Sequence, residues 1–197
     1  SGYAKDHHTL TENIKKLIDT GIAGINIEDT QHNNHSLRTA ESQSERIDCI
    51  RQTVSAMGIP LFINARTDVY LNSNHLSAEE KLEETIRRGK AYKNAGADGF
   101  YPIFLQSKED IELIIKEVDL PVNILLLPDI PNFNILQQLG VARVSLGPGF
   151  LKTAINAMKN TAEKLLQYEG MEEVKNNPVT SAYINSLIST GMFRHKL

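Results

Sequence analysis

The sequence lacks several features that mark particular classes of protein. It contains one cysteine, Cys49, so no disulfide can form within the chain, and nothing indicates an oxidising compartment. The longest apolar candidate, residues 122–127, is far shorter than the roughly 20 residues of a membrane span. The formal net charge of -3 gives no basic surplus for nucleic acid, and the first residues lack the apolar core of a signal peptide. We therefore expect a globular, cytoplasmic protein that binds neither nucleic acid nor membranes.

Motifs of several enzyme classes are missing as well. The chain has no Gly-x-Ser-x-Gly elbow, no Walker phosphate-binding loop and no Cys-x-x-Cys pair. These absences argue against the common serine hydrolase, nucleotide-hydrolysing and dithiol chemistries. Any catalytic function must then come from other polar side chains.

Five short apolar stretches predict buried β-strands. They are rich in β-branched residues and are bounded by Gly, Pro or Asp, as in strands covered on both faces. They span residues 22–27, 61–65, 98–101, 122–127 and 142–146. Amphipathic segments lie between them, and three helix-to-strand turns carry a glycine, at Gly21, Gly96 and Gly140. This repetition predicts an α/β fold with parallel strands, either doubly wound or closed into a barrel.

The number of strands leaves the architecture open. A closed barrel needs eight strands and typically about 250 residues, whereas this chain has 197 residues and five predicted strands. Either the sheet is open, or the first three units are missing. The mass of 22.0 kDa suits a single domain over residues 1–197.

Polar residues gather where the predicted strands end, which is the working face of a parallel α/β fold. Glu28 and Asp29 follow the first strand and are hard oxygen donors suited to Mg²⁺, although they could instead cap a loop or pair with an arginine. Arg66 ends the second strand, and its guanidinium matches a carboxylate or a phosphonate. Its alternative role is a structural salt bridge to Glu28, Asp29 or Asp68. Together these strand ends predict an anionic substrate held on a metal.

A long polar loop follows the first strand, over residues 31–42, with Leu37 as its one large apolar residue. Loops above strand ends often act as lids, and a surface loop without a role is the alternative. His32 and His35 lie in this loop. We interpret both as solvated side chains rather than as metal ligands.

Three segments resemble motifs of the isocitrate lyase/phosphoenolpyruvate mutase superfamily. Residues 24–29 (Gly-Ile-Asn-Ile-Glu-Asp) are similar to its Gly-(Val/Ile)-x-(Ile/Leu)-Glu-Asp strand. Residues 64–68 (Asn-Ala-Arg-Thr-Asp) resemble its Ala-Arg-Thr-Asp/Glu strand end, and residues 95–99 its next helix-to-strand turn. The segments 121–123 and 143–147 look most like the mutase-like (phosphoenolpyruvate phosphonomutase-like) branch. The resemblance extends over essentially the whole chain.

The resemblance implies a (β/α)₈ TIM barrel, of which this chain supplies the C-terminal part, strands four to eight with their helices. Residues 1–4 (Ser-Gly-Tyr-Ala) resemble the end of the motif that follows the third strand of the family. The first three βα units would then precede Ser1. The aspartates that bind Mg²⁺ most directly would also lie upstream of Ser1.

The resemblance also implies a Mg²⁺-dependent lyase, hydrolase or mutase-like reaction, with Mn²⁺ as an alternative ion. A C–C or P–C bond in a small 2-oxo or 2-hydroxy carboxylate would break through an enolate. Carried over by position, Glu28 is a catalytic residue of the metal shell, acting through water, and Arg66 is a catalytic residue that binds the substrate's carboxylate or phosphonate. Asn123 and Ser145 are substrate-binding candidates from their strand positions alone. Because terminal helices of this family commonly pack between subunits, we expect a homo-oligomer, either a dimer or a tetramer.

Two departures from the family narrow this expectation. Isocitrate and methylisocitrate lyases carry a Lys-x-Cys-Gly-His segment after Glu-Asp, but residues 30–37 here read Thr-Gln-His-Asn-Asn-His-Ser-Leu. The catalytic cysteine is therefore absent, which argues against both activities. Asn33 or Asn34 could match an asparagine of the mutases, but their loop lysine is absent too. A truncated or degenerate barrel that acts through association, without catalysis, is the alternative to an enzyme.

Overall fold

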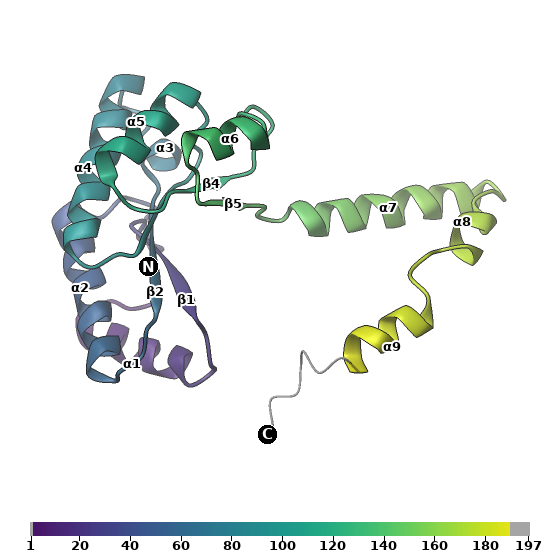
Figure 1. Cartoon of the computed structure of the whole chain (residues 1–197), viewed down its shortest axis with the longest axis horizontal. Helices are drawn as coiled ribbons and strands as arrows, with labels where there is room; N and C mark the ends of the chain where they lie inside the picture. The colour runs from purple at the N-terminus through teal and green to yellow at the C-terminus, as the bar shows by residue number, and fades with distance from the viewer. Residues whose placement is uncertain (1, 190–197) are drawn as a thin grey trace. The chain divides into compact units, whose positions relative to one another are not determined.

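Helices and strands alternate along the chain in the computed structural model, which describes residues 2–189 (Figure 1). The strands are β1 (Gly24–Glu28), β2 (Phe62–Thr67), β3 (Gly99–Pro102), β4 (Asn123–Leu125) and β5 (Arg143–Ser145). The helices are α1 (His7–Ile18), α2 (Ala40–Ala56), α3 (Val69–Asn72), α4 (Ala78–Asn94), α5 (Lys108–Val118), α6 (Phe133–Leu139), α7 (Gly149–Leu166), α8 (Met171–Lys175) and α9 (Ser181–Ser189). None of the helices in this described part is both long and apolar enough to cross a membrane.

The chain divides into two compact units, Ser1–Gly147 and Pro148–Leu197. The first unit holds all five strands and the helices α1 to α6, and the second holds α7 to α9. The sequence predicts a single domain over residues 1–197. That would require the two units to pack on each other, so the single domain stays a prediction.

Every described strand pair is parallel, and the strand order follows the chain order. β2 lies between β1 and β3, β4 pairs with β5, and a bridge between Phe100 and Val122 connects β3 to the start of β4. The five predicted strands and their parallel direction are therefore confirmed. Their ends differ from the predicted ones by one or two residues.

Side-chain hydrogen bonds cap several of the helices. Ser77 and Glu80 form a capping box at the start of α4, in which each side chain accepts from the other residue's backbone N–H. Ser107 and Asn132 cap α5 and α6 through their side-chain oxygens. Three helix-to-strand turns hold a glycine with φ of 79°, 95° and 87°, in the left-handed region that glycine favours: Gly21, Gly96 and Gly140.

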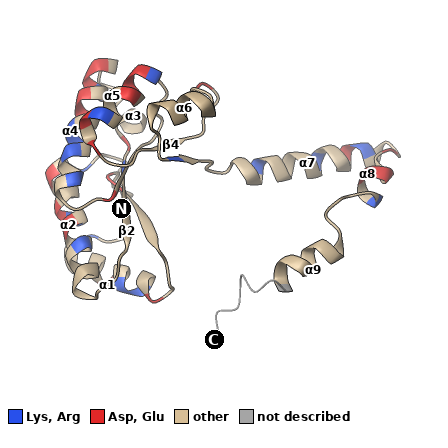
Figure 2. Cartoon of the chain, viewed as in Figure 1, with Lys and Arg blue, Asp and Glu red and all other residues tan. Residues whose placement is uncertain are grey.

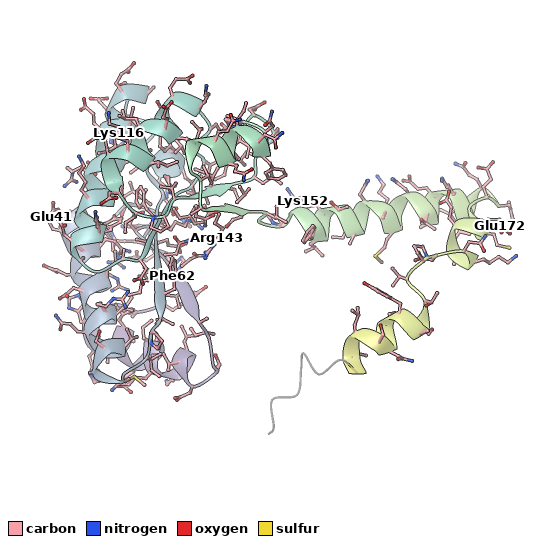
Figure 3. All side chains as sticks on the ribbon, viewed as in Figure 1. Glu41, Phe62, Lys116, Arg143, Lys152 and Glu172 are labelled. Atoms are coloured by element: carbon pink, nitrogen blue, oxygen red, sulfur yellow. The ribbon has the colours of Figure 1, made fainter. Side chains whose placement is uncertain are left out.

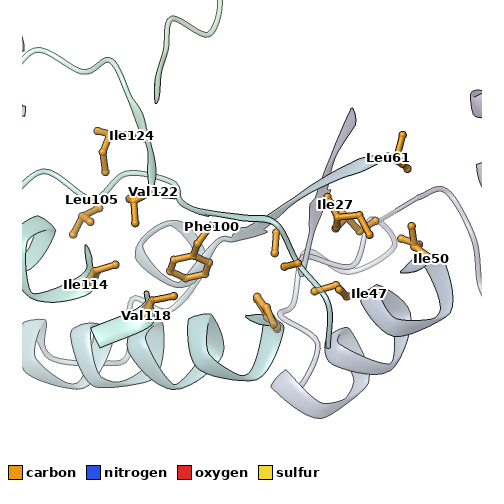
Figure 4. Packing of buried hydrophobic residues seen from close by; sticks show 14 of the residues in the cluster. Ile27, Ile47, Ile50, Leu61, Phe100, Leu105, Ile114, Val118, Val122 and Ile124 are labelled. Carbon is orange, nitrogen blue, oxygen red and sulfur yellow. The ribbon is translucent and has the colours of Figure 1, made fainter. Parts of the chain in front are cut away.

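The apolar core lies between the sheet and the helices that cover it (Figure 4). Ile27 of β1 and Phe100 of β3 are fully buried against side chains of α2 and α5, among them Ile47 and Val118. Because successive residues of a strand point to opposite faces, the residues between these apolar ones face away from the helices. Because the apolar strand residues face the helices, the alternate residues of each strand lie on the opposite face of the sheet.

That other face of the sheet is polar. Asn64 of β2 donates a 2.7 Å hydrogen bond through Nδ2 to Oδ1 of Asn26 in β1. Two residues further along, Glu28 and Arg66 are partners in the β-sheet register. Residues two apart on a strand share a face, so these two pairs form successive rows that lead to the carboxyl ends of the strands.

Charged residues cover the outer surfaces of α2, α4 and α5 (Figure 2). Lys90 and Lys93 of α4 pair with Glu117 and Asp119, at 2.7 Å and 2.6 Å, and so connect α4 to α5 and its C-cap. These pairs are exposed to solvent, and each contributes little to stability. The charged side chains on these helices therefore face solvent, and they are not part of the candidate site at the strand ends.

The second unit exposes many apolar side chains. None of the described side chains in α7, α8 or α9 is buried. The large exposed apolar residues of α7 and α9 include Phe150, Leu151, Met158 and Leu187. The last described helix, α9, ends at Ser189, and the residues from Thr190 onward lie outside the described part of the chain.

Gly89 tests how closely α4 packs on the core. A Cβ atom at this position would lie 2.6 Å from Val118 Cγ2 and 3.1 Å from Phe100 Cε1, both too close. Alanine usually stabilises a helix interior by about 1 kcal/mol relative to glycine. Here we expect Gly89→Ala to lower the free energy of unfolding by about 1–3 kcal/mol, because the methyl group overpacks the core.

Urea denaturation followed by circular dichroism measures this change. Glu83→Ala, at an exposed position of the same helix, is the control and should change stability by less than about 0.5 kcal/mol. A Gly89→Ala protein as stable as the wild type would show that α4 and α5 lie further apart than described.

Candidate active site

Glu28 and Arg66 lie side by side where β1 and β2 end. Arg66 Nη1 is 3.4 Å from Glu28 Oε2, and the other carboxylate oxygen of Glu28 is 3.5 Å from His32 Nε2. The side chains of Glu28 and Arg66 are each 24% exposed, so a small ligand can reach both. The structure thus brings together the two residues that the sequence predicted as catalytic.

A buried aspartate holds Arg66 from behind. Arg66 Nε donates a 2.6 Å hydrogen bond to Oδ1 of Asp68, which is 1% exposed. Although burial disfavours its charge, the hydrogen bond to Asp68 and the nearby carboxylate of Glu28 raise the pKa of Arg66 above its ordinary value. The arginine is therefore fully charged and fixed along one edge.

Asp29 faces the core and not the site. It is fully buried, and its carboxylate accepts hydrogen bonds from Thr67 Oγ1 (2.7 Å), Tyr92 Oη (2.8 Å), Arg88 Nη1 (2.9 Å) and the Asp68 backbone N–H (2.9 Å). Burial raises the pKa of Asp29, while the Arg88 guanidinium and the hydroxyl donors act in the opposite direction. Of the two alternatives that the sequence leaves open for Asp29, these contacts support pairing with an arginine.

Tyr101, Asn123 and Ser145 extend the polar row across β3, β4 and β5. Ser145 Oγ donates to Asn123 Oδ1 at 3.0 Å, and Ser145 also lies near enough to Tyr101 to affect the pKa of its hydroxyl. Burial raises the pKa of Tyr101, although Ser145 and the charge of Arg66 oppose that rise. Asn123 and Ser145 thus contact each other. Tyr101 lies between them and Arg66, because both Ser145 and Arg66 affect the pKa of its hydroxyl. The sequence offered no reason to select Tyr101 beyond its place at a strand end.

Nearer the amino ends of the strands, an arginine and two asparagines lie around the ring of Phe62. Arg143 of β5 lies over the ring of Phe62 in β2, with its guanidinium carbon 5.6 Å from the ring centroid (Figure 3). Both residues also line a small cavity of about 300 Å³ together with Asn26 and Asn64. Strands that are not neighbours in the sheet thus meet across its polar face, as they do when a sheet curves.

The loop after β1 is anchored at its base. Thr30 and Leu37 form an antiparallel bridge, and Arg38 donates its backbone N–H to the Asp29 carbonyl at 2.9 Å. Only residues 31–36 project beyond this bridge. His32 stacks on the ring of Tyr3, with centroids 5.2 Å apart, and is half exposed beside Glu28. The interpretation of His32 as a simply solvated side chain was incomplete, because the hairpin at the loop base brings it back to the strand end.

The cavity at this edge has a volume of about 490 Å³. It is lined by the side chains of Glu28, His32, Asn26 and Tyr3, with apolar residues of α1 on the far side. Arg66 does not line this cavity, so the cavity adjoins the Glu28–Arg66 pair on the side of β1 and α1.

The described residues do not by themselves form a magnesium site. No group of three or more His, Cys, Asp or Glu side chains among residues 2–189 is placed to hold a metal ion. At the ends of β1 and β2, Asp29 and Asp68 use their carboxylate oxygens for hydrogen bonds, so Glu28 is the carboxylate that solvent reaches. Magnesium bound here would need further oxygen ligands.

A sequence model of the family described as phosphoenolpyruvate phosphomutase matches residues 1–166 of the chain. The chain belongs to this family. That membership confirms the resemblance seen in the strand-end motifs. Relatives of the chain include lyases, among them 2-methylisocitrate lyases.

Individual members of the superfamily show the same relationship. An uncharacterized protein of Mycobacterium tuberculosis is 30% identical over 146 residues, which are 74% of this chain and 51% of that protein. The 2-methylisocitrate lyase of Escherichia coli is 28% identical over 182 residues, 87% of this chain and 58% of the lyase. The chain thus spans about half the length of the curated relatives it matches.

Solved structures are similar in fold to most of the chain. A putative phosphonomutase from Burkholderia cenocepacia has 34% identity and a TM-score of 0.75, over 85% of this chain and 66% of that protein. A 2,3-dimethylmalate lyase has 21% identity and a TM-score of 0.78, over 96% and 65% of the two chains. The second likeness concerns the fold alone.

The Asp29–Arg88 pair is the basis of a stability prediction. We expect Asp29→Asn to lower the free energy of unfolding by about 3–5 kcal/mol, because it removes the buried counter-charge of Arg88 and leaves Glu84 as its remaining partner. Urea denaturation measures the loss. Asp48→Asn, at an exposed position, is the control and should have little effect.

A double variant separates the effect of an unpaired charge on the free energy of unfolding from the effect of lost packing. Asp29→Asn combined with Arg88→Met should be less destabilised than the sum of the two single changes, because no buried charge is left unpaired. Additive losses would contradict the proposed pairing.

Proposed function

We propose that this chain forms strands four to eight of a (β/α)₈ barrel in an enzyme that breaks a C–C or P–C bond of a small 2-oxo or 2-hydroxy carboxylate through an enolate. Family membership and the parallel strands in chain order support this proposal. The outer edge of β1 has no partner strand among the described residues, which is consistent with further strands beside it. The polar face that carries Glu28 and Arg66 would be the inside of the barrel.

The placement of Arg66 beside Glu28 is the observation that carries the proposal. A guanidinium with its charge secured can bind the carboxylate or phosphonate of the substrate by two parallel hydrogen bonds. The same charge favours the negative charge that grows on the substrate when the bond breaks. Asn123 and Ser145 are proposed to bind substrate from the neighbouring strands.

We propose Mg²⁺, with Mn²⁺ as an alternative, as the cofactor. Glu28 would belong to its outer shell through water, and the direct aspartate ligands would come from residues upstream of Ser1. When bound, the ion supplies Lewis-acid stabilisation of an enolate oxygen. The residues of this chain act around it by binding and orienting the carboxylate.

The loop argues for a reaction without a catalytic cysteine. Residues 30–37 contain none, and Cys49 lies on α2, where its sulfur is 3.4 Å from Thr11 Oγ1 and 3.8 Å from the His7 carbonyl oxygen. That position is on the helix layer and away from the strand ends. The similarity to 2-methylisocitrate lyases therefore supports the fold and the carboxylate substrate more than that particular reaction.

We further propose a homo-oligomer, a dimer or a tetramer, in the cytoplasm. The exposed apolar residues of α7 and α9 support association. The same exposed apolar residues are equally consistent with a degenerate barrel that has no catalytic activity and acts through association. That alternative stays a prediction, and turnover decides between the two.

Arg66→Lys tests the proposed reaction in the natural full-length protein with Mg²⁺. Oxaloacetate, phosphonopyruvate, 2,3-dimethylmalate and 2-methylisocitrate are offered, and product formation is followed by NMR. We expect at least one to be turned over, and Arg66→Lys to lower kcat/KM by roughly 10²–10³-fold, because an ammonium group cannot form two parallel bonds.

Arg87→Lys is the matched control. This arginine is half exposed and pairs with Glu84 and Glu41 on the helix surface, so its replacement should leave kcat/KM unchanged. Turnover of none of the four substrates, or an Arg66→Lys protein as active as the wild type, would contradict the proposal.

A further inference from the structure

We propose that Asp68 is a positioning residue that aims Arg66 at the substrate, and that Thr30 sets Asp68 from the base of the loop. The inference rests on the proposed function, in which Arg66 binds a carboxylate or phosphonate. Asp68 itself is 1% exposed, so it does not touch the ligand and acts through the arginine.

The Asp68 carboxylate is held on both oxygens. Oδ1 accepts from Arg66 Nε at 2.6 Å, and Oδ2 accepts from the Thr30 hydroxyl at 2.5 Å. Its backbone N–H donates to the buried Asp29 carboxylate at 2.9 Å. The aspartate can therefore neither rotate nor withdraw without breaking a buried hydrogen bond.

Asp68 decides which edge of Arg66 is offered. A guanidinium has five donors in one plane, and binding at Nε fixes the orientation of that plane. Nη1 lies near Glu28 at 3.4 Å, and no described residue hydrogen-bonds Nη2. The two Nη groups thus form the edge that is left for a ligand with two oxygens.

Asp68 also keeps Arg66 from closing on Glu28. Arginine and glutamate side chains this near each other would readily form a two-bond ion pair, which would occupy both the substrate-binding group and the carboxylate proposed for the metal shell. The observed 3.4 Å contact is longer than such a pair would have. The shorter bond of Arg66 to the buried aspartate, at 2.6 Å, is consistent with that distance.

Thr30 connects this arrangement to the loop. It is 7% exposed, its hydroxyl accepts from Asn72 Nδ2 at 2.8 Å while donating to Asp68, and its backbone bridges to Leu37. A movement of the loop that displaced Thr30 would remove a donor from Asp68. The position of the loop and the aim of Arg66 are thus coupled through one hydroxyl group.

The first readout is the Nε–Hε signal of Arg66 in a ¹⁵N-correlated NMR spectrum, assigned by its loss in Arg66→Lys. Asp68→Asn should shift this signal and speed its exchange with water, because the charged acceptor is gone. Asp98→Asn is the matched control. Asp98 forms a comparable pair with Arg51 at the opposite ends of the strands, so its replacement should leave the Arg66 signal in place.

The second readout is the affinity for oxalate, a two-carboxylate probe, in the presence of Mg²⁺, with the natural full-length protein. We expect Asp68→Asn to weaken oxalate binding roughly tenfold, the usual size for a lost supporting contact. Thr30→Val should weaken it by a smaller factor and Thr30→Ser should restore it, since only the serine keeps the hydroxyl. A purely structural role would lower stability in both Asp68→Asn and Thr30→Val and leave oxalate affinity unchanged in the folded proteins.

The outcomes separate this inference from the proposed function. An unchanged Arg66 signal in Asp68→Asn, or unchanged oxalate affinity in Asp68→Asn and Thr30→Val, overturns the positioning role. If Asp68→Asn does not fold, Thr30→Val carries the same test alone. A wild-type protein that binds no oxalate, with the Arg66 signal still shifted by Asp68→Asn, overturns the proposed function and leaves Asp68 as the residue that orients Arg66.

Discussion

The first unit depends on one buried carboxylate, that of Asp29. A charge with no exposure is tolerated only when partners surround it, and those partners come from two other elements. Thr67 and the Asp68 backbone belong to the end of β2, while Arg88 and Tyr92 belong to α4. Satisfying Asp29 therefore forces the ends of β1 and β2 together under α4. The neighbouring residue, Glu28, is carried to the side of Arg66 by the same constraint.

The sequence predicts much of this arrangement, because strands, turns and strand ends each have a recognisable residue pattern. Buried parallel strands read as continuous apolar runs, and glycine is favoured where φ is positive, so the strands and their helix-to-strand turns are found directly. Parallel pairing brings the carboxyl ends to one edge, which predicts that Glu28 and Arg66 meet. The alternation of faces along a strand also implies that Glu28 and Asp29 point in opposite directions.

Other parts of the site could not be read from the sequence. The partner of Asp29 is Arg88, 59 positions away on a helix with many charged residues, and nothing in their spacing identifies the pair. His32 approaches Glu28 because the loop folds back on the Thr30–Leu37 bridge, a hairpin without a recognisable turn signature. Tyr101 and Asp68 gain their roles from register and burial, which only the assembled sheet defines.

The Thr30–Leu37 bridge has a consequence for how proteins of this fold diversify. Because the backbone closes at the bridge, residues 31–36 contribute little to the core, and the sheet and helices do not depend on their identity. Substitutions there can accumulate while the strands stay in register and the arginine stays charged. The hairpin tip is thus a segment in which selection can alter ligand preference without first having to rescue the fold.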